Sequence, residues 1–249
     1  MIRKYTIILV ILMLGCVAGV VEAKDYLSGE ICSNDDVLYG KFEVHMKPAK
    51  GSGLISSFFL YKTDSHKVDV PWNEIDIEIL GKDTTKVQTN ILSGPEYRIS
   101  YVKLHDMESD VADNFHTYTL EWTPKHISFA IDGKQIRYED KRQVDHFWNQ
   151  PMTYRFNLWP THHSGWAGVF DDSVLPAYHT IDWIRYYEYT PGAGPDGSDF
   201  TFAWADNFDT FDEKRWNKAF WTFPENLSKF SDRHVVVEDG LLYLILEKR

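Results

Sequence analysis

The strongest constraint on the fold is the ten-residue segment PWNEIDIEIL, residues 71–80. Read with a period of two, it separates apolar from acidic side chains, as in a β-strand whose successive side chains point to opposite faces. The apolar face carries three β-branched residues that suit the inside of a sheet, namely Ile75, Ile77 and Ile79. The other face carries Trp72, Glu74, Asp76 and Glu78. Carboxylates side by side on one face repel one another, so the pattern indicates chemistry, although a solvated acidic face on an edge strand is the simpler alternative.

The three acids suit the hydrolysis of a glycosidic bond. Enzymes that retain the anomeric configuration hold two carboxyl groups about 5–5.5 Å apart. Residues i and i+4 of a straight strand are about 13 Å apart at the backbone, so the strand must curve with its acids on the concave side. Glu74 and Glu78 can then lean towards each other across a sugar. Asp76 is one methylene shorter and can hydrogen-bond one of them, which keeps their pKa values apart.

The rest of the chain consists of short alternating runs separated by turn residues, with no sustained 3.6-residue period from Tyr39 onward. Residues 127–138 and 235–246 are predicted hairpins around Asp-Gly pairs. Many strands without helices predict an all-β sandwich, with a loop over residues 95–114. Segment 190–198 is a predicted linker, and its spaced glycines form no dinucleotide site because no amphipathic helix follows. The 50 or so residues after it are too few for a secure separate β domain, so residues 24–249 are expected to form one domain.

Other predicted strands add sugar-binding side chains to the acidic face. In residues 153–159, one face is apolar and the other carries Arg155, Asn157 and Trp159. An indole can cover a pyranose face while polar groups take the hydroxyls. The same mixture recurs on other strands, at Phe59 with Tyr61, at Gln88 with Asn90, and at Trp72 beside the acids. Core packing is the commoner explanation for any one aromatic residue, but four strands with one mixed face favour a sugar cleft.

The first 23 residues read as a secretory signal, with Arg3 and Lys4 before an apolar run that is too short to span a membrane. Cys16 follows Met-Leu-Gly and loosely resembles a lipoprotein cleavage site, but ordinary secretion is favoured. If Cys16 is removed with the signal, Cys32 has no partner for an intramolecular disulfide. Removal of residues 1–23 leaves 24 basic and 36 acidic residues, a net charge of −12. This charge argues against nucleic acid and anionic membranes as partners and is neutral towards an uncharged polysaccharide.

Three segments together resemble a known family: YGKFEVHMKPAK at 39–50, SSFF at 56–59, and residues 72–88. They are similar to the bacterial lichenases, the 1,3-1,4-β-glucanases of glycoside hydrolase family 16. The resemblance runs from about Lys24 to the end of the chain. It implies a concanavalin-like jelly roll of two curved antiparallel sheets with an open cleft. It also implies a secreted endo-β-glucanase, expected to be a monomer, that cleaves β-1,4 bonds next to β-1,3 bonds.

The resemblance assigns roles residue by residue. It makes Glu74 the nucleophile, Asp76 its support and Glu78 the general acid/base, with no cofactor in the chemistry. Matches to cleft residues of the family are Tyr61, Trp72, Gln88, Asn90, Arg155, Asn157, Trp159 and Trp221. The family often binds a structural calcium ion, whose ligands correspond here to the Asp182 carboxylate and the backbone carbonyls of Asn207 and Gly240. Oxygen ligands of this kind suit Ca²⁺.

The order of the segments departs from the family. Residues 206–246 resemble a segment that most lichenases carry at the amino terminus, but here they follow segment 190–198. This order implies a circular permutation, which is compatible with a sandwich whose termini lie close together.

Two alternative functions remain open. A carbohydrate-binding module or lectin would keep the aromatic cleft but would not need three aligned carboxylates. A related enzyme, a laminarinase or a xyloglucan-active hydrolase, would share the acids. Laminarinases usually carry one extra residue between the Asp and the second Glu, which this strand lacks, whereas xyloglucan enzymes share the motif as it stands.

Overall fold

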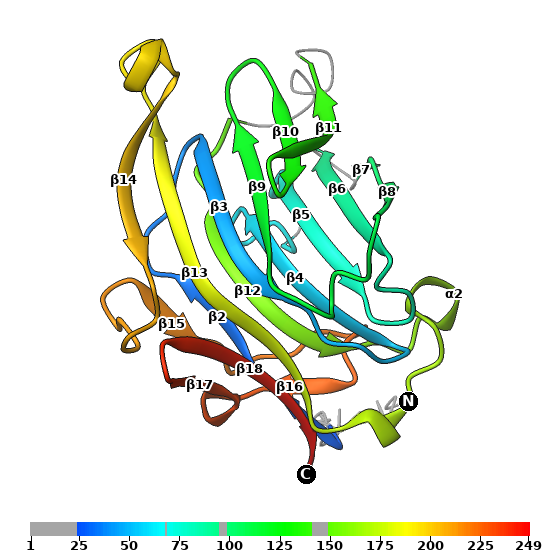
Figure 1. The fold of residues 1–249 in the computed structure, drawn as a ribbon. Coiled ribbons are helices and arrows are strands. Elements are labelled where there is room, and N and C mark those ends of the chain that lie inside the picture. Colours follow the sequence, from blue (N-terminus) through cyan, green and yellow to red (C-terminus); the bar gives the residue numbers. More distant parts are fainter. Residues whose placement is uncertain (1–23, 68, 95–98, 141–148) are drawn as a thin grey trace, which may run out of the picture.

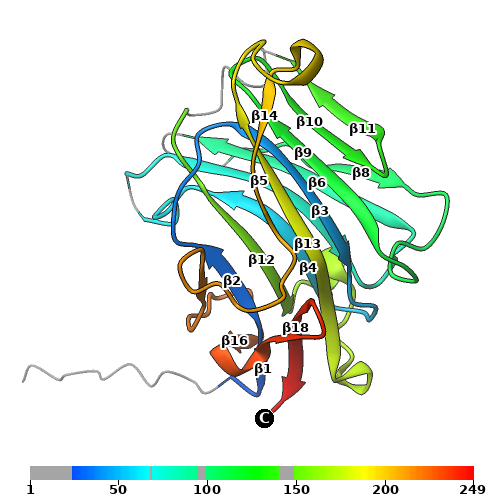
Figure 2. The same ribbon diagram turned by 60° about the vertical axis from the view of Figure 1, so that its left-hand side comes forward.

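The computed structural model describes residues 24–67, 69–94, 99–140 and 149–249, which form a sandwich of two sheets (Figures 1 and 2). The first, sheet I, runs in the order β11 (Lys134–Glu139), β10 (Ile127–Ile131), β9 (His116–Trp122), β3 (Gly40–Lys47), β13 (Ala177–Tyr189), β18 (Leu241–Lys248), β1 (Tyr26–Ser28) and β16 (Ser228–Phe230). Two further strands join it, β14 (Phe200–Asp206) beside β13 and β17 (Val235–Glu238) beside β18. The predicted all-β jelly-roll sandwich is therefore confirmed.

The second sheet, sheet II, carries the acidic strand at its centre. Its order is β15 (Trp216–Lys218), β2 (Glu30–Ser33), β12 (Thr153–Pro160), β4 (Leu54–Tyr61), β5 (Trp72–Leu80), β6 (Lys86–Gly94) and β7 (Ile99–Ser100), with β8 (Lys103–Asp106) also paired to β6. The described helices are short: α2 (Ser164–Ala167) and the 3₁₀ turns η1 (Asp172–Val174), η2 (Pro195–Gly197) and η3 (Asp232–His234).

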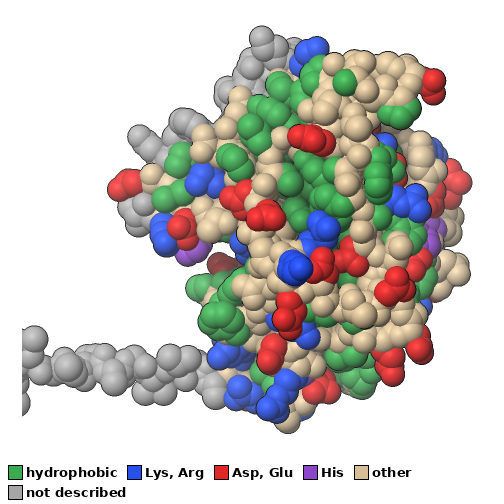
Figure 3. Space-filling view, turned by 90° about the vertical axis from the view of Figure 1, so that its left-hand side faces the viewer, with side chains coloured by type: hydrophobic (Ala, Val, Ile, Leu, Met, Phe, Trp, Pro, Cys, Tyr) green, Lys and Arg blue, Asp and Glu red, His purple; other side chains and the backbone are tan. Residues whose placement is uncertain are grey.

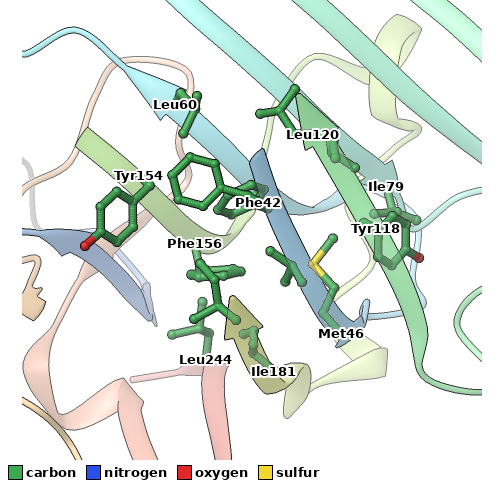
Figure 4. Close-up of a cluster of buried hydrophobic side chains, with 14 of the residues drawn as sticks. Phe42, Met46, Leu60, Ile79, Tyr118, Leu120, Tyr154, Phe156, Ile181 and Leu244 are labelled. Atoms are coloured by element: carbon green, nitrogen blue, oxygen red, sulfur yellow. The ribbon is translucent and has the colours of Figure 1, made fainter. Parts of the chain in front are cut away.

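The apolar faces of the two sheets meet in one core, as the period-two pattern predicts (Figure 4). Phe42 and Met46 of sheet I lie against Tyr154 and Phe156 of sheet II, and none of the four is more than 2% exposed. The isoleucine face of β5 belongs to this core. Because the isoleucines take the inner face, the acids of β5 are directed to the opposite, outer face of sheet II.

A buried histidine makes polar contacts between the two sheets. His179 of β13 is fully buried, with its Nδ1 3.1 Å from the backbone oxygen of Asn157 and its Nε2 3.4 Å from the Met46 sulfur. Burial lowers the pKa of His179 to about 4, because the interior disfavours the charged imidazolium. His179 therefore links β13 to β12 as a neutral ring.

The two ends of the described chain are neighbours. Tyr26 of β1 pairs with Lys248 of β18, and the Arg249 amide donates to the Asp25 carbonyl at 3.0 Å. Segment 190–198 forms the loop between β13 and β14, which pair antiparallel, so the strands on either side of the predicted linker share one sheet (Figure 1).

Local predictions can be compared with the described residues. Both Asp-Gly hairpins are confirmed, as β10–β11 and β17–β18. The loop predicted over residues 95–114 is wrong in part, because β7 and β8 lie within it. β8 pairs with β6 at the edge of sheet II, and three of its four side chains are exposed, so no apolar alternation marks it. The predicted signal and Cys16 lie outside the described residues.

Among the described residues, no helix is long and apolar enough to cross a membrane. Cys32 is a buried free cysteine. On the face shown in Figure 3, lysine and arginine side chains are for the most part interspersed with acidic ones, with hydrophobic side chains between them.

Candidate active site

The predicted site residues lie in rows across the outer face of sheet II, because strand register sets which side chains stand opposite one another. One row contains Glu30, Asn157, Ser57, Glu78 and Gln88. The next contains Cys32, Arg155, Phe59, Asp76 and Asn90. In a third row Tyr61 stands opposite Glu74. Directly opposite side chains on one face are about 4.5–5.5 Å apart at Cβ, so the three acids are surrounded by the side chains predicted to bind sugar.

Glu74 is held by two aromatic neighbours. The Trp72 indole donates a hydrogen bond to Glu74 Oε2 at 2.7 Å, and the Tyr61 ring packs edge-on against Trp72 with 6.0 Å between centroids. Burial raises the pKa of Tyr61 to about 12, with the Glu74 charge as the next contribution. Tyr61 therefore stays a neutral donor. Glu74 is only partly buried and remains accessible from the outer face.

Glu78 is held from the neighbouring strand. Gln88 of β6 donates a side-chain hydrogen bond to Glu78 Oε2 at 2.5 Å. The Trp166 indole in turn donates to Gln88 Oε1 at 3.1 Å. Asp76 lies between the two glutamates and is 5% exposed. The acids thus differ in environment, as two carboxyl groups with different tasks require.

Sequence analysis missed a fourth acid, Glu30. It is 2% exposed, accepts a hydrogen bond from Asn157 Nδ2 at 3.1 Å, and has its Oε1 3.6 Å from Arg155. Burial raises the pKa of Glu30 to about 7, and the charge of Glu74 adds to the rise, while Arg155 and Asn157 oppose it. Alternation in Glu30-Ile31-Cys32 could have indicated this strand, but β2 is only four residues long.

Arg155 is fixed by several contacts at once. Its Nε donates to Thr153 Oγ1 at 2.8 Å, and its guanidinium lies 4.8 Å from the Tyr61 ring and 5.8 Å from the Trp221 ring. The structure therefore brings Arg155, Asn157, Tyr61 and Trp221 to one side of the acids. Asn90 lies on the other side and accepts a hydrogen bond from Ser100, a residue that sequence analysis did not single out.

Trp159 is more buried than a stacking surface would require. It is 8% exposed and lies in a small cluster on the outer face, where its ring contacts Phe223 at 4.8 Å and Trp166 at 5.9 Å. The cluster also includes Ile55, Leu80, Ala167, Ala219, Phe230 and Trp221. A second small core thus covers the end of the sheet beside Glu78, and a sugar-stacking role for Trp159 stays a prediction.

The predicted calcium ligands lie near one another in the strand register of sheet I. β13 pairs with β18 up to Ile181 and with β14 from Ile184. Asp182 therefore lies at the point along β13 where the pairing partner changes from β18 to β14. Asn207 directly follows β14, and Gly240 directly precedes β18. Asp182 Oδ2 is 2.7 Å from His45 Nδ1. The described residues contain no group of three or more His, Cys, Asp or Glu side chains suited to a metal, so this donor set relies on backbone carbonyls, which Ca²⁺ accepts.

The raised pKa of Glu30 predicts a pH-dependent stability. Between pH 4.5 and about 7 the folded protein keeps the Glu30 proton and the unfolded chain loses it, so this group lowers the free energy of unfolding as pH rises. The uncharged Glu30→Gln variant should therefore gain up to about 3 kcal/mol over wild type across this interval. Urea denaturation at pH 4.5, 5.5 and 7.5 measures the difference. The exposed Glu213→Gln is the control, and a difference for Glu30→Gln that does not grow with pH would contradict the prediction.

Comparison with known proteins agrees with the geometry. The family model for glycosyl hydrolases family 16 matches residues 17–185. A beta-glucanase of Fibrobacter succinogenes is 43% identical over 231 residues, covering 92% of this chain and 66% of that protein. A beta-glucanase of Brevibacillus brevis is 39% identical over 170 residues, 66% of this chain and 62% of that protein. The chain thus spans about two thirds or less of the length of these relatives.

Solved structures show the same fold. The Bacillus licheniformis beta-glucanase has a TM-score of 0.55 at 36% identity, covering 63% of this chain and 70% of that one. A prokaryotic beta-1,3-1,4-glucanase (lichenase) derived from a mouse hindgut metagenome has a TM-score of 0.55 at 31% identity, covering 64% and 78%.

Proposed function

Because the chain belongs to glycosyl hydrolases family 16, we propose that it is a retaining endo-β-glucanase that cleaves β-1,4 bonds next to β-1,3 bonds in mixed-linkage glucans. The observation that carries the proposal is the set of rows on sheet II. Glu74, Asp76 and Glu78 share one face of β5, and the same face of β4, β6 and β12 supplies aromatic rings, amides and one guanidinium. A binding module has no need of the three carboxylates.

The reaction proceeds in two displacements. Glu74 attacks the anomeric carbon while Glu78, as an acid, protonates the departing glycosidic oxygen. Glu78 then takes a proton from water, and the resulting hydroxide displaces Glu74 from the glycosyl-enzyme. Two inversions restore the β configuration. Asp76 supports the nucleophile, and no cofactor takes part in either step.

Linkage selectivity follows from polar groups that need a partner. A mixed-linkage glucan bends wherever a β-1,3 bond interrupts the β-1,4 run. A chain with the wrong bend would leave groups such as Arg155 and Asn157 unpaired, at a cost of about 1–3 kcal/mol each. Support comes from their fixed positions, since Arg155 is held by Thr153 and Asn157 by Glu30. The name of the hindgut structure, a beta-1,3-1,4-glucanase, supports the same substrate class.

A substrate panel tests this proposal. We expect strong activity on barley β-glucan and lichenan, releasing short oligosaccharides with a β-1,3 bond at the reducing end. Carboxymethylcellulose should be almost untouched and laminarin at best weakly cut. Proton NMR of the first product should show the β anomer before mutarotation. Faster hydrolysis of laminarin or xyloglucan than of lichenan would contradict the specificity, and an α anomer appearing first would contradict the mechanism.

We also propose that Ca²⁺ binds the Asp182 carboxylate and the carbonyls of Asn207 and Gly240, where it supplies charge neutralisation and ties three segments of sheet I together. Support comes from their common place in the sheet register. A ligand at about 100 times its dissociation constant adds about 2.7 kcal/mol of stability. Chelation should therefore lower the melting temperature while activity at low temperature persists. Asp182→Asn should remove the response to chelator, and a melting curve that chelator does not move would rule out the site.

Three further proposals concern the whole protein. Residues 1–23 are a signal that is removed on secretion, which amino-terminal sequencing of the exported protein tests. The enzyme acts as a monomer, which sedimentation at micromolar concentration tests.

The chain is circularly permuted relative to most of its family, a proposal supported by the end of the family match at residue 185 and by the adjacent ends. Structural superposition of residues 206–246 on the amino-terminal segment of the Bacillus licheniformis enzyme tests the permutation.

A further inference from the structure

A chain of two hydrogen bonds leads from outside the row of acids to Glu78. The Trp166 indole donates to Gln88 Oε1 at 3.1 Å, and Gln88 Nε2 donates to Glu78 Oε2 at 2.5 Å. Trp166 belongs to α2, in the segment that follows β12, and the acid belongs to β5. Gln88 is 6% exposed, so the residue that links the two bonds is buried.

The chemistry of Trp166, Gln88 and Glu78 fixes which group donates and which accepts in each of the two hydrogen bonds. An indole N–H can only donate, whereas a glutamine amide presents one accepting end and one donating end. With Trp166 on one side, the carbonyl end of Gln88 must face the indole and the NH₂ end must face Glu78. Without the indole, the amide could turn and present its oxygen to the carboxyl group. Trp166 thus selects which end of Gln88 meets Glu78.

Backbone hydrogen bonds anchor the segment that carries Trp166. The Gly53 amide donates to the Ala167 carbonyl at 2.8 Å, and the Asp171 amide donates to the Ser52 carbonyl at 3.2 Å. Ala167 is fully buried in the small cluster that also contains Trp159. Gly53 has a φ of +84°, and a Cβ there would lie 2.4 Å from the Phe170 backbone, so the close approach of the two segments requires glycine.

We propose that Trp166 is a positioning residue for proton transfer, acting through Gln88 to hold the Glu78 carboxyl group in one orientation. The inference rests on the proposed role of Glu78. A donated N–H favours the carboxylate over the acid and fixes the position of the oxygen that accepts it. Sheet pairing of β5 and β6 brings Gln88 opposite Glu78, but the orientation of its amide is set by Trp166.

The test is Trp166→Phe, which keeps an aromatic ring against Trp159 and removes the N–H. We expect kcat/KM on lichenan to fall about tenfold. The alkaline limb of the pH–rate profile, which reports loss of the acid's proton, should move up by about half a unit to one unit. On an aryl glycoside with a good leaving group, kcat/KM should fall less, because departure of that group needs little protonation.

Trp216→Phe is the matched control, because it also removes an indole hydrogen bond but at a site away from Glu78. Trp216 is 1% exposed, and its indole donates to Asp206 Oδ2 at 2.8 Å on the edge of sheet II away from Glu78. Trp216→Phe should lower the melting temperature without moving the pH–rate profile. A double variant of Trp166→Phe with Gln88→Leu should be no slower than Gln88→Leu alone, because the indole acts only through the amide.

Wild-type protein gives an independent measurement if Trp166→Phe does not fold. In ¹⁵N-labelled enzyme, the indole resonance that Gln88→Leu displaces should titrate with the midpoint of the alkaline limb. An unmoved limb in Trp166→Phe, additive effects in the double variant, or an indole resonance that does not titrate would each overturn the inference. If Glu78→Ala itself shows no dependence on the leaving group, the role of Glu78 fails instead, which is a separate result.

Discussion

Glu74→Ala is expected to lower kcat/KM on lichenan by at least about 10⁴-fold, because removal of a nucleophile leaves only binding and the acid/base to act. The protein should remain folded. Glu74 is partly exposed on the outer face of β5, and one of its partners is the neighbouring Trp72 indole. Loss of its charge also removes a repulsion felt by the buried Glu30. Steady-state hydrolysis and thermal melting of the same preparation measure both parts.

Chemical rescue separates this role from a loss of binding. Azide fits the space left by the carboxylate and can attack the anomeric carbon from the same side while Glu78 still protonates the leaving group. Glu74→Ala in azide should therefore release an α-glycosyl azide from an activated aryl glycoside. The control is Glu43→Ala, an acid on sheet I whose partners are Lys41 and Tyr187. Glu74→Ala losses no larger than those of this control would contradict the assignment.

Glu78→Ala should lose about 10²–10⁴-fold on polysaccharide, the usual contribution of a general acid/base. The reason is that an alkoxide leaves poorly unless its oxygen is protonated in the transition state. An aryl glycoside whose leaving group is already a weak base needs little of that proton, so the first displacement should be nearly as fast as in wild type. Stopped-flow measurement should then show a burst followed by slow hydrolysis of the glycosyl-enzyme.

Azide again gives a distinct product for this variant. With Glu74 present, azide attacks the glycosyl-enzyme in place of water, needs no general base, and should yield a β-glycosyl azide. The two variants thus predict opposite anomers from one reagent. Equal losses on good and poor leaving groups, or the same azide anomer from both variants, would show that Glu74 and Glu78 do not have different tasks.

The faces of long strands could be predicted because period-two alternation is a local property. From Ile75 to Ile79 in β5 every second residue is isoleucine, a pattern that suits a strand with one buried face. The same parity placed Arg155 and Asn157 on the side of the acids, as the register of β12 and β4 bears out. The same parity on β6 predicted that Asn90 and Gln88 lie on the side of the acids, where they stand opposite Asp76 and Glu78.

Residues that reach the acids by long-range contact could not be predicted. Glu30 lies on a four-residue strand whose alternation covers too few positions to distinguish it from a loop. Trp166 meets Gln88 across 78 positions of sequence and comes from a single helical turn with no period to read. Trp159 has the correct parity, but the small cluster that covers it is assembled from β4, β5, α2, β16 and the segment after β15.

The opposite pKa shifts of His179 and Glu30 have a consequence for proton balance on folding. Near pH 5.5 the unfolded chain carries a proton on the histidine and none on the glutamate, whereas the folded protein has the reverse. Folding thus releases one proton in the core and takes up one in the cleft. As pH rises, His179 alone would increase the free energy of unfolding and Glu30 alone would decrease it. Together they exchange almost no net proton with the solvent, and between about pH 4.5 and 6.5 their contributions to the pH dependence of stability cancel.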